Sequence, residues 1–303
     1  MRATPLFASL LLASLSGCQS LPVADPDAGA ASAPVAGSPV EGAAAHDNLN
    51  AVLWMQRSAE YRAAARTVFQ AATAGLDAAL DDPTWDALVP AERARAAPLA
   101  GLPPAIIVDI DETVLDNSPY QARMVVDGNE FDDTSWEAWV EERRAPAVPG
   151  AVAFAQAAAA RGVQIVYLSN RTAASGEATL ANLRQVGLPL SPTPVFLGTG
   201  TVVPGCTQSS SSDKTCRRLL AGRSYRVLMQ FGDQVGDFTA PAANTPAARE
   251  AMVDGHGGWF GERWWMLPNP TYGGWEPAVF DNAWDRTRGQ RREAKRDALL
   301  LSR

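Results

Sequence analysis

Apolar runs of strand length alternate with segments of helical periodicity through most of the chain. The strand-like runs cover residues 106–109, 163–168, 194–197, 225–231 and 264–267. Between them, helical patterns cover 150–162, 175–186 and 214–221, and Pro149 and Gly162 bracket the first of these as a helix start and stop. Alternation of strands and helices predicts an α/β fold with a largely parallel sheet and helices on both faces.

Three further segments complete the predicted organisation. Apolar or small residues at helical spacing over 49–80, with an apolar continuation toward residue 99, predict one or two helices packed on the core. Residues 117–148 are aromatic and acidic and are interpreted as a long irregular insertion, which in an enzyme usually borders the site. Residues 285–303 are highly charged and predict a solvated helix. The main folded domain is therefore predicted to span residues 46–284, with a separate C-terminal helix after it.

The first 45 residues have the composition of a targeting segment and a linker. The apolar run 5–17 is too short to span a membrane, which takes roughly 20 residues. It ends Leu15-Ser16-Gly17-Cys18, which resembles a bacterial lipobox and implies a signal peptide over 1–17 with lipidation of Cys18. The alternative is an ordinary signal peptide with a chance cysteine. Residues 18–45, rich in Ala, Pro, Gly and Ser, predict a flexible tether.

The net charge bears on the class of ligand that the protein can bind, and the cysteine content bears on whether it contains a disulfide. The formal net charge of −7 argues against a surface that binds a nucleic-acid polymer. An anionic substrate would therefore need a metal ion or local cations. If Cys18 carries lipid, Cys206 and Cys216 remain, and an exported domain with one such pair predicts a disulfide. The alternative is two free thiols.

The first strand-like run ends in two carboxylates, Asp109 and Asp111, spaced by one residue. Alternation along a regular strand would place both on one face, where their repulsion favours a divalent cation. One aspartate can then attack a phosphorus atom while the other transfers a proton. The alternative is an Asp-rich turn after an edge strand.

Later strand ends supply the other parts of a phosphoryl-transfer site, because ligands of open parallel sheets bind beyond the carboxyl ends of the strands. A Mg²⁺ site is predicted at Asp109, Asp111, Asp233 and Asp237, with Asp237 acting through water. Ser169, the backbone at Asn170, and Lys214 are predicted to hold phosphate oxygens. Taken singly, each has a structural alternative: a helix cap, a surface charge or a turn residue.

In this order the residues resemble the haloacid dehalogenase superfamily, and more closely the bacterial class C acid phosphatases, also described as outer-membrane lipoprotein 5′-nucleotidases. The similarity runs over about 48–280 and is carried by segments 48–61, 109–120, 136–140, 147–151, 169–171, 232–237 and 266–276, with Lys214. It implies a Rossmann-like core with a smaller, mainly helical accessory part, magnesium dependence, an acidic pH optimum and often a homodimer. The Cys206–Cys216 pair is not a family feature.

The resemblance also implies that Trp136 and Tyr272 hold a nucleobase, as aromatic faces can do. The alternative is that both pack in the core, where Trp54, Trp264 and Trp265 are expected. Together these interpretations predict an outer-membrane, magnesium-dependent acid phosphatase that hydrolyses phosphomonoesters, with 5′-nucleotides as substrates, through an aspartyl-phosphate. The alternatives are a phosphotransferase to alcohol acceptors and a surface lipoprotein that binds a ligand without turnover.

Overall fold

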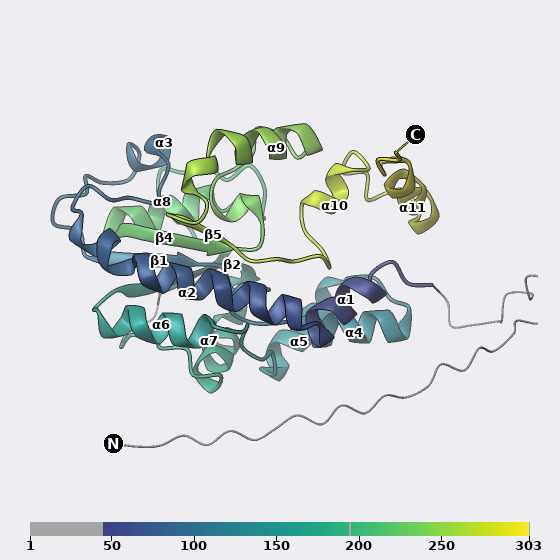
Figure 1. Ribbon diagram of the computed structural model, residues 1–303, viewed down its shortest axis with the longest axis horizontal. Helices are drawn as coiled ribbons and strands as arrows, with labels where there is room; N and C mark the ends of the chain where they lie inside the picture. The colour runs from purple at the N-terminus through teal and green to yellow at the C-terminus, as the bar shows by residue number, and fades with distance from the viewer. Residues whose placement is uncertain (1–44, 194, 303) are drawn as a thin grey trace, which may run out of the picture. The chain divides into compact units, whose positions relative to one another are not determined.

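The computed structural model describes residues 45–193 and 195–302, which contain a five-stranded sheet in the order β3-β2-β1-β4-β5 (Figure 1). The strands are all parallel and coincide with the predicted apolar runs. They are β1 (Pro104–Val108), β2 (Gln164–Thr172), β3 (Val195–Thr199), β4 (Arg226–Gly232) and β5 (Trp264–Met266). The predicted fold class, α/β with a mostly parallel sheet, is confirmed.

The central strand β1 leads directly into Asp109 and Asp111, hereafter the acidic motif. It pairs with β2 on one side and β4 on the other, so that Ile107 lies beside both Val166 and Gln230. The ladder continues into the motif, because the Asp109 amide donates to the Phe231 carbonyl at 2.9 Å. Asp109 therefore emerges between the carboxyl ends of β2 and β4, where a parallel sheet places its ligands.

Successive residues of β1 pack on opposite faces of the sheet, as strand alternation requires. Ile106 and Val108 join the core beneath α2 (Ala59–Asp81), α6 (Ala151–Ala160) and α7 (Gly176–Gln185). Ile107 joins the core on the other face, with α8 (Thr215–Ser224) and α9 (Pro246–Gly255), and the short α3 (Pro90–Arg93) lies on this same side (Figure 1). Trp264 and Trp265 are buried as predicted, whereas Trp54 is half-buried.

The predicted N-terminal helical segment is two helices, α1 (Leu49–Arg57) and α2. They separate at Ser58, whose extended backbone breaks the helix and whose hydroxyl accepts from the Tyr61 amide at 3.0 Å. This is an N-cap, which satisfies a backbone donor that the first helical turn leaves free.

The interpretation of 117–148 as irregular is wrong, because α4 (Ser118–Asp127) and α5 (Asp133–Glu142) fill most of it. Pro119 occupies the first turn of α4, and Gly128 ends that helix in the left-handed region with φ of 70°. Asp132 caps α5 by accepting from the Ser135 amide at 2.9 Å. These helices and α1 lie beyond the carboxyl end of β1 and form the predicted helical accessory part (Figure 1).

The C-terminal segment contains α10 (Trp275–Ala278) and α11 (Arg288–Asp297). The charged helix is shorter than predicted and is packed by ion pairs on one side rather than fully solvated. Arg292 pairs with Asp47 at 2.6 Å, and the buried Arg291 pairs with Glu130. No helix within the described residues is long and apolar enough to cross a membrane. Cys18, the predicted signal peptide and the tether up to residue 44 lie outside the described residues.

Candidate active site

Asp109 lies at the centre of the site, nearly buried at 5% exposure. Its two carboxylate oxygens have different partners: Oδ1 accepts from the Lys214 ammonium group, and Oδ2 accepts from the Thr113 hydroxyl at 3.1 Å. Lys214 stands at the N-terminal end of α8, beyond the sheet edge, and reaches back to the end of β1. The predicted approach of Lys214 to Asp109 is therefore present in the structure.

Asp233 and Asp237 join Asp109 in a carboxylate cluster, hereafter the three-aspartate cluster. One oxygen from each of the three lies within 4.8 Å of the others. Asp237 enters it from the 3-10 turn η2 (Val235–Asp237) after β4, and its Oδ1 accepts from Lys214 at 2.6 Å. Gly232 makes this approach possible, because a Cβ there would lie 2.3 Å from the Asp237 side chain.

Burial and mutual repulsion dominate the electrostatics of the three-aspartate cluster. Burial raises the pKa of Asp109 to about 7; the Lys214 ammonium lowers it, and the carboxylates of Asp237 and Asp111 add to the rise. Burial raises the pKa of Asp233 well above its ordinary value, and the carboxylates of Asp237 and Asp109 add to the rise. Burial lowers the pKa of Lys214, but attraction to the carboxylates of Asp109 and Asp237 has the larger effect, so the pKa of Lys214 is raised. The Lys214 ammonium group thus contacts two of the three carboxylates in the cluster.

The donor set fits a divalent cation with a preference for oxygen ligands, such as Mg²⁺. Asp109 and Asp233 are the residues that would hold it directly. Asp237 accepts from Lys214 through Oδ1 at 2.6 Å and from the Gln234 amide through Oδ2 at 2.8 Å. Its predicted contact with the metal through water remains a prediction. The fourth predicted ligand, Asp111, does not bring its carboxylate into the cluster. Its carboxylate pairs with Arg171 instead, and its role as a metal ligand remains a prediction.

We expect Mg²⁺ to stabilise the protein more at about pH 7.5 than at about pH 5. Between the ordinary pKa of an aspartate and the raised pKa of Asp109, the folded chain keeps a proton that the unfolded chain has lost. Stability without metal therefore falls as pH rises through this window. Mg²⁺ binds the ionised carboxylates, and saturation at 100 times its Kd would contribute about 2.7 kcal/mol.

Thermal unfolding with Mg²⁺ or EDTA at both pH values measures this difference. Asp233→Asn is the control, because loss of one ligand should remove the Mg²⁺ effect. An equal Mg²⁺ effect at the two pH values would contradict the raised pKa of Asp109.

Asp111 is held by donors from the end of β2 and from the start of α4. Its Oδ1 accepts from Arg171 Nη2 at 2.8 Å and from Asn117 Nδ2 at 2.9 Å, and its Oδ2 accepts from the Ser169 hydroxyl at 3.3 Å. Ser169 is buried, and Asn170, the next residue, is exposed toward solvent. The strand ends of β1 and β2 thus bring together the predicted proton-transfer and phosphate-binding residues.

The residues at these strand ends match a known family. The model of the HAD superfamily, subfamily IIIB (acid phosphatase), matches residues 38–275. This chain belongs to that family. Its fold agrees with the crystal structures of a class C acid phosphatase from Bacillus anthracis, one of them with tungstate bound: 31% identity, a TM-score of 0.71, and coverage of 84% of this chain and 98% of that one.

Two plant relatives are more distant. The chain is 28% identical to a stem 31 kDa glycoprotein of Glycine max and 25% identical to acid phosphatase 1 of Solanum lycopersicum, over 55% of its own length. It spans somewhat over half the length of these relatives, 58% and 57% respectively.

Two buried residues of this HAD site were missed from the sequence. Glu112 is fully buried with φ of 58°, and its carboxylate accepts from the Asn117 amide at 2.7 Å and from the Tyr272 hydroxyl. Arg217 donates to the Ser169 carbonyl and, at 2.8 Å, to Asn170 Oδ1. A carboxylate directly after the Asp-x-Asp pair, and an arginine almost one helical turn after Lys214, were the available signals.

Trp136 and Tyr272 both border the acidic motif, and each is half-buried. The Trp136 ring covers the Arg171 guanidinium group, with 5.5 Å from its carbon to the ring centroid, and meets Tyr120 edge-on at 5.3 Å. Tyr272 is fixed by its hydrogen bond to Glu112. Their predicted contact with a nucleobase remains a prediction.

Cys206 and Cys216 form a disulfide with Cα atoms 5.7 Å apart, which is the pairing that the cysteine count predicts. It ties the loop before Lys214 to α8. We expect Cys206→Ser with Cys216→Ser to lower the free energy of unfolding by about 3 kcal/mol in the chain-entropy model. Urea unfolding of the oxidised protein, the reduced protein and the double variant measures it. Identical midpoints for all three would contradict this contribution.

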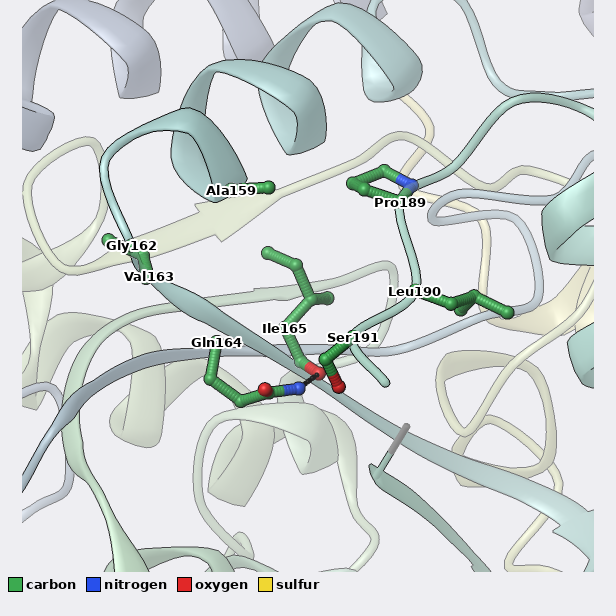
Figure 2. Close-up of a pocket in the computed structure, with 8 residues that line it drawn as sticks. All are labelled: Ala159, Gly162, Val163, Gln164, Ile165, Pro189, Leu190 and Ser191. Atoms are coloured by element: carbon green, nitrogen blue, oxygen red, sulfur yellow. Dashed lines mark hydrogen bonds between the residues drawn. The ribbon is translucent and has the colours of Figure 1, made fainter. Parts of the chain in front are cut away.

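A separate cavity of about 260 Å³ lies at the opposite end of β2 from the site (Figure 2). It is lined by Val163, Gln164 and Ile165 at the start of that strand and by Pro189 and Leu190 from the loop before β3. The active-site residues of β2, Ser169–Arg171, lie near the carboxyl end of that strand, so this cavity is separate from the candidate active site.

Proposed function

We propose that this protein is a magnesium-dependent acid phosphatase that hydrolyses phosphomonoesters, 5′-nucleotides among them, through an aspartyl-phosphate on Asp109. The observation that carries the proposal is the buried Asp109 carboxylate, which contacts Lys214 and lies within the three-aspartate cluster at the end of the central strand. A purely structural site is not expected to gather three carboxylates, two of them buried, around an ammonium group, because burial of unpaired carboxylates is costly.

The residues divide the reaction into two displacements at phosphorus. An Asp109 oxygen attacks, the bond from phosphorus to the ester oxygen breaks, and Asp111 gives that oxygen its proton. Water then attacks the aspartyl-phosphate, Asp111 takes a proton from the water, and phosphate leaves with Asp109 regenerated. Asp111 suits both steps because it stands outside the three-aspartate cluster, where Arg171 and Asn117 fix its orientation.

Phosphate binding is assigned to Ser169, the Asn170 backbone and Lys214. When bound, Mg²⁺ supplies positive charge that offsets the repulsion between substrate and carboxylates. The class C acid phosphatase from Bacillus anthracis, which shares this fold, has been crystallised with tungstate bound. Tungstate is a tetrahedral oxyanion like phosphate, which supports a site for a phosphate group in this chain.

A phosphomonoesterase assay with Mg²⁺ and with EDTA tests the proposal, with glycerol added as an acceptor. We expect phosphate release that depends on Mg²⁺. Formation of glycerol phosphate at the expense of phosphate would favour the phosphotransferase alternative. Binding of a nucleotide without turnover would favour the non-catalytic lipoprotein, against which the complete set of Asp109, Asp111, Lys214 and Asp233 argues.

We expect Trp136→Ala and Tyr272→Ala each to raise KM for nucleoside monophosphates, because base stacking contributes roughly 1–3 kcal/mol. Purine and pyrimidine nucleotides should both be affected, since stacking does not read base edges. Tyr272→Phe is the matched control: it keeps the ring and loses only the hydrogen bond to Glu112. Unchanged KM values for nucleotides in both alanine variants would contradict a role in base binding.

The attachment of the domain to the outer membrane through lipid on Cys18 is part of the proposal and rests on the sequence around that residue. Labelling with a fatty-acid analogue tests it, with Cys18→Ser as the control. Label retained in that variant would contradict lipidation. A homodimer, which the family resemblance implies, is tested by light scattering of the mature domain.

A further inference from the structure

Arg171 is a buried cation that contacts the proton-transfer residue Asp111 and takes no direct part in either displacement at phosphorus. It follows Ser169 and Asn170 at the end of β2, and only 2% of it is exposed. Its Nη1 donates to the Thr179 hydroxyl at 3.3 Å on α7, which fixes the guanidinium plane from behind. A buried arginine with partners on several elements holds one orientation.

The contacts of Arg171 make the two oxygens of Asp111 unequal. Oδ1 accepts from Arg171 Nη2 at 2.8 Å, from Arg171 Nε at 3.0 Å and from Asn117 Nδ2 at 2.9 Å. Oδ2 has only longer contacts, at 3.3 Å from both Ser169 Oγ and Arg171 Nε. Oδ1 is therefore the anchored oxygen, and Oδ2 is the oxygen left to carry a proton to a substrate.

The flat face of the same guanidinium group lies under Trp136 of α5. A second link runs in parallel, because Asn117 Oδ1 accepts from the indole Nε1 of Trp139, also on α5, at 2.8 Å. A guanidinium stacked on an aromatic ring is attracted by the ring's quadrupole, more strongly where water is excluded. Two residues of α5 therefore contact the side chains that hold Asp111, Trp136 through Arg171 and Trp139 through Asn117.

We propose that Arg171 is a positioning residue that sets the Asp111 oxygen facing the leaving group and couples it to Trp136 of the accessory helices. The inference rests on the proposed function, because it assigns Asp111 the proton given to the leaving oxygen. It predicts that assistance to the leaving group, rather than phosphate binding, depends on Arg171.

The test is the dependence of kcat/KM on the leaving group, since kcat/KM includes only the steps up to phosphoryl transfer to Asp109. Ethyl phosphate needs its leaving oxygen protonated, trifluoroethyl phosphate needs this less, and 4-nitrophenyl phosphate least. For Arg171→Lys we expect kcat/KM to fall about 100-fold with ethyl phosphate, the lower end of the range for general acid catalysis. With 4-nitrophenyl phosphate we expect a fall of about threefold or less, because little assistance is lost.

Arg217→Lys is the matched control, because Arg217 is also a buried arginine beside Ser169 but does not touch Asp111. It should lower kcat/KM by a similar factor for all three substrates. If Arg171→Lys does the same, Arg171 serves only the local structure and the inference is wrong. Should Arg171→Lys fail to fold, Thr179→Val removes one anchor of Arg171 and should show the same selectivity to a smaller degree.

Coupling to the accessory helices is tested with Trp136→Leu and the two alkyl phosphates, which have no ring to stack. We expect Trp136→Leu to lower kcat/KM more for ethyl phosphate than for trifluoroethyl phosphate. In the Arg171→Lys background, we expect Trp136→Leu not to increase the difference in kcat/KM between the two esters any further. An unchanged difference in the single variant, or full additivity in the double variant, would overturn the coupling. A wild-type protein that hydrolyses none of the three esters would instead contradict the proposed function itself.

Discussion

Asp109→Asn is expected to lower kcat by roughly 10⁴-fold or more, as removal of a catalytic nucleophile does. An amide at this position cannot form the acyl phosphate. The substitution also removes one of three crowded carboxylates, while Lys214 keeps its bond of 2.6 Å to Asp237. The variant should therefore remain folded, with a melting temperature equal to or above that of the wild type in EDTA.

The matched control is Asp77→Asn, the same substitution at an exposed carboxylate on α2 that pairs with Arg161. It should leave kcat and KM unchanged. Phosphatase activity of Asp109→Asn close to the wild-type level, with an intact thermal transition, would reject Asp109 as the nucleophile.

Lys214→Met is expected to damage both activity and stability. The ammonium group is buried against Asp109 and Asp237, and breaking a buried ion pair by removing one partner costs about 3–5 kcal/mol. The loss of a positive charge beside the transferred phosphoryl group should lower kcat/KM by roughly 10²–10³-fold. Mg²⁺ should recover part of the stability, because it supplies positive charge to the same carboxylates, and little of the activity.

Lys295→Met is the control, since Lys295 pairs with Glu276 on the C-terminal side and lies away from the three-aspartate cluster. Activity assays measure the loss of kcat/KM, and urea unfolding measures the loss of stability. Each is carried out with Mg²⁺ and with EDTA. A Lys214→Met protein with wild-type kcat/KM would show that Lys214 is a structural counter-ion only.

The location of the site could be predicted from sequence because parallel strands end at a common edge. Asp109, Ser169 and Asp233 each follow an apolar run, and topology alone brings them to that edge. Lys214 could be placed there from its position at the start of a helix.

The contacts that orient these residues could not be predicted in the same way. Arg171 meets Asp111 across 60 positions of sequence, and Tyr272 meets Glu112 across 160. Such pairs depend on how α4, α5 and the C-terminal segment pack, and no local pattern encodes that packing. The helices of 118–142 were missed for a different reason: their start and stop signals, Pro119 and Gly128, were present, but the aromatic and acidic composition suggested an irregular segment.

The stereochemical course at phosphorus tests the covalent route most directly, whether or not an intermediate accumulates. The substrate is a phosphorothioate monoester whose non-bridging positions hold one sulfur atom and two different oxygen isotopes, so that phosphorus is chiral. It is hydrolysed in water that carries the third oxygen isotope. The configuration of the released thiophosphate is then determined. Two successive displacements, by Asp109 and then by water, each invert phosphorus, so we predict net retention. Net inversion would mean that water attacks the substrate directly, and it would contradict an aspartyl-phosphate on Asp109.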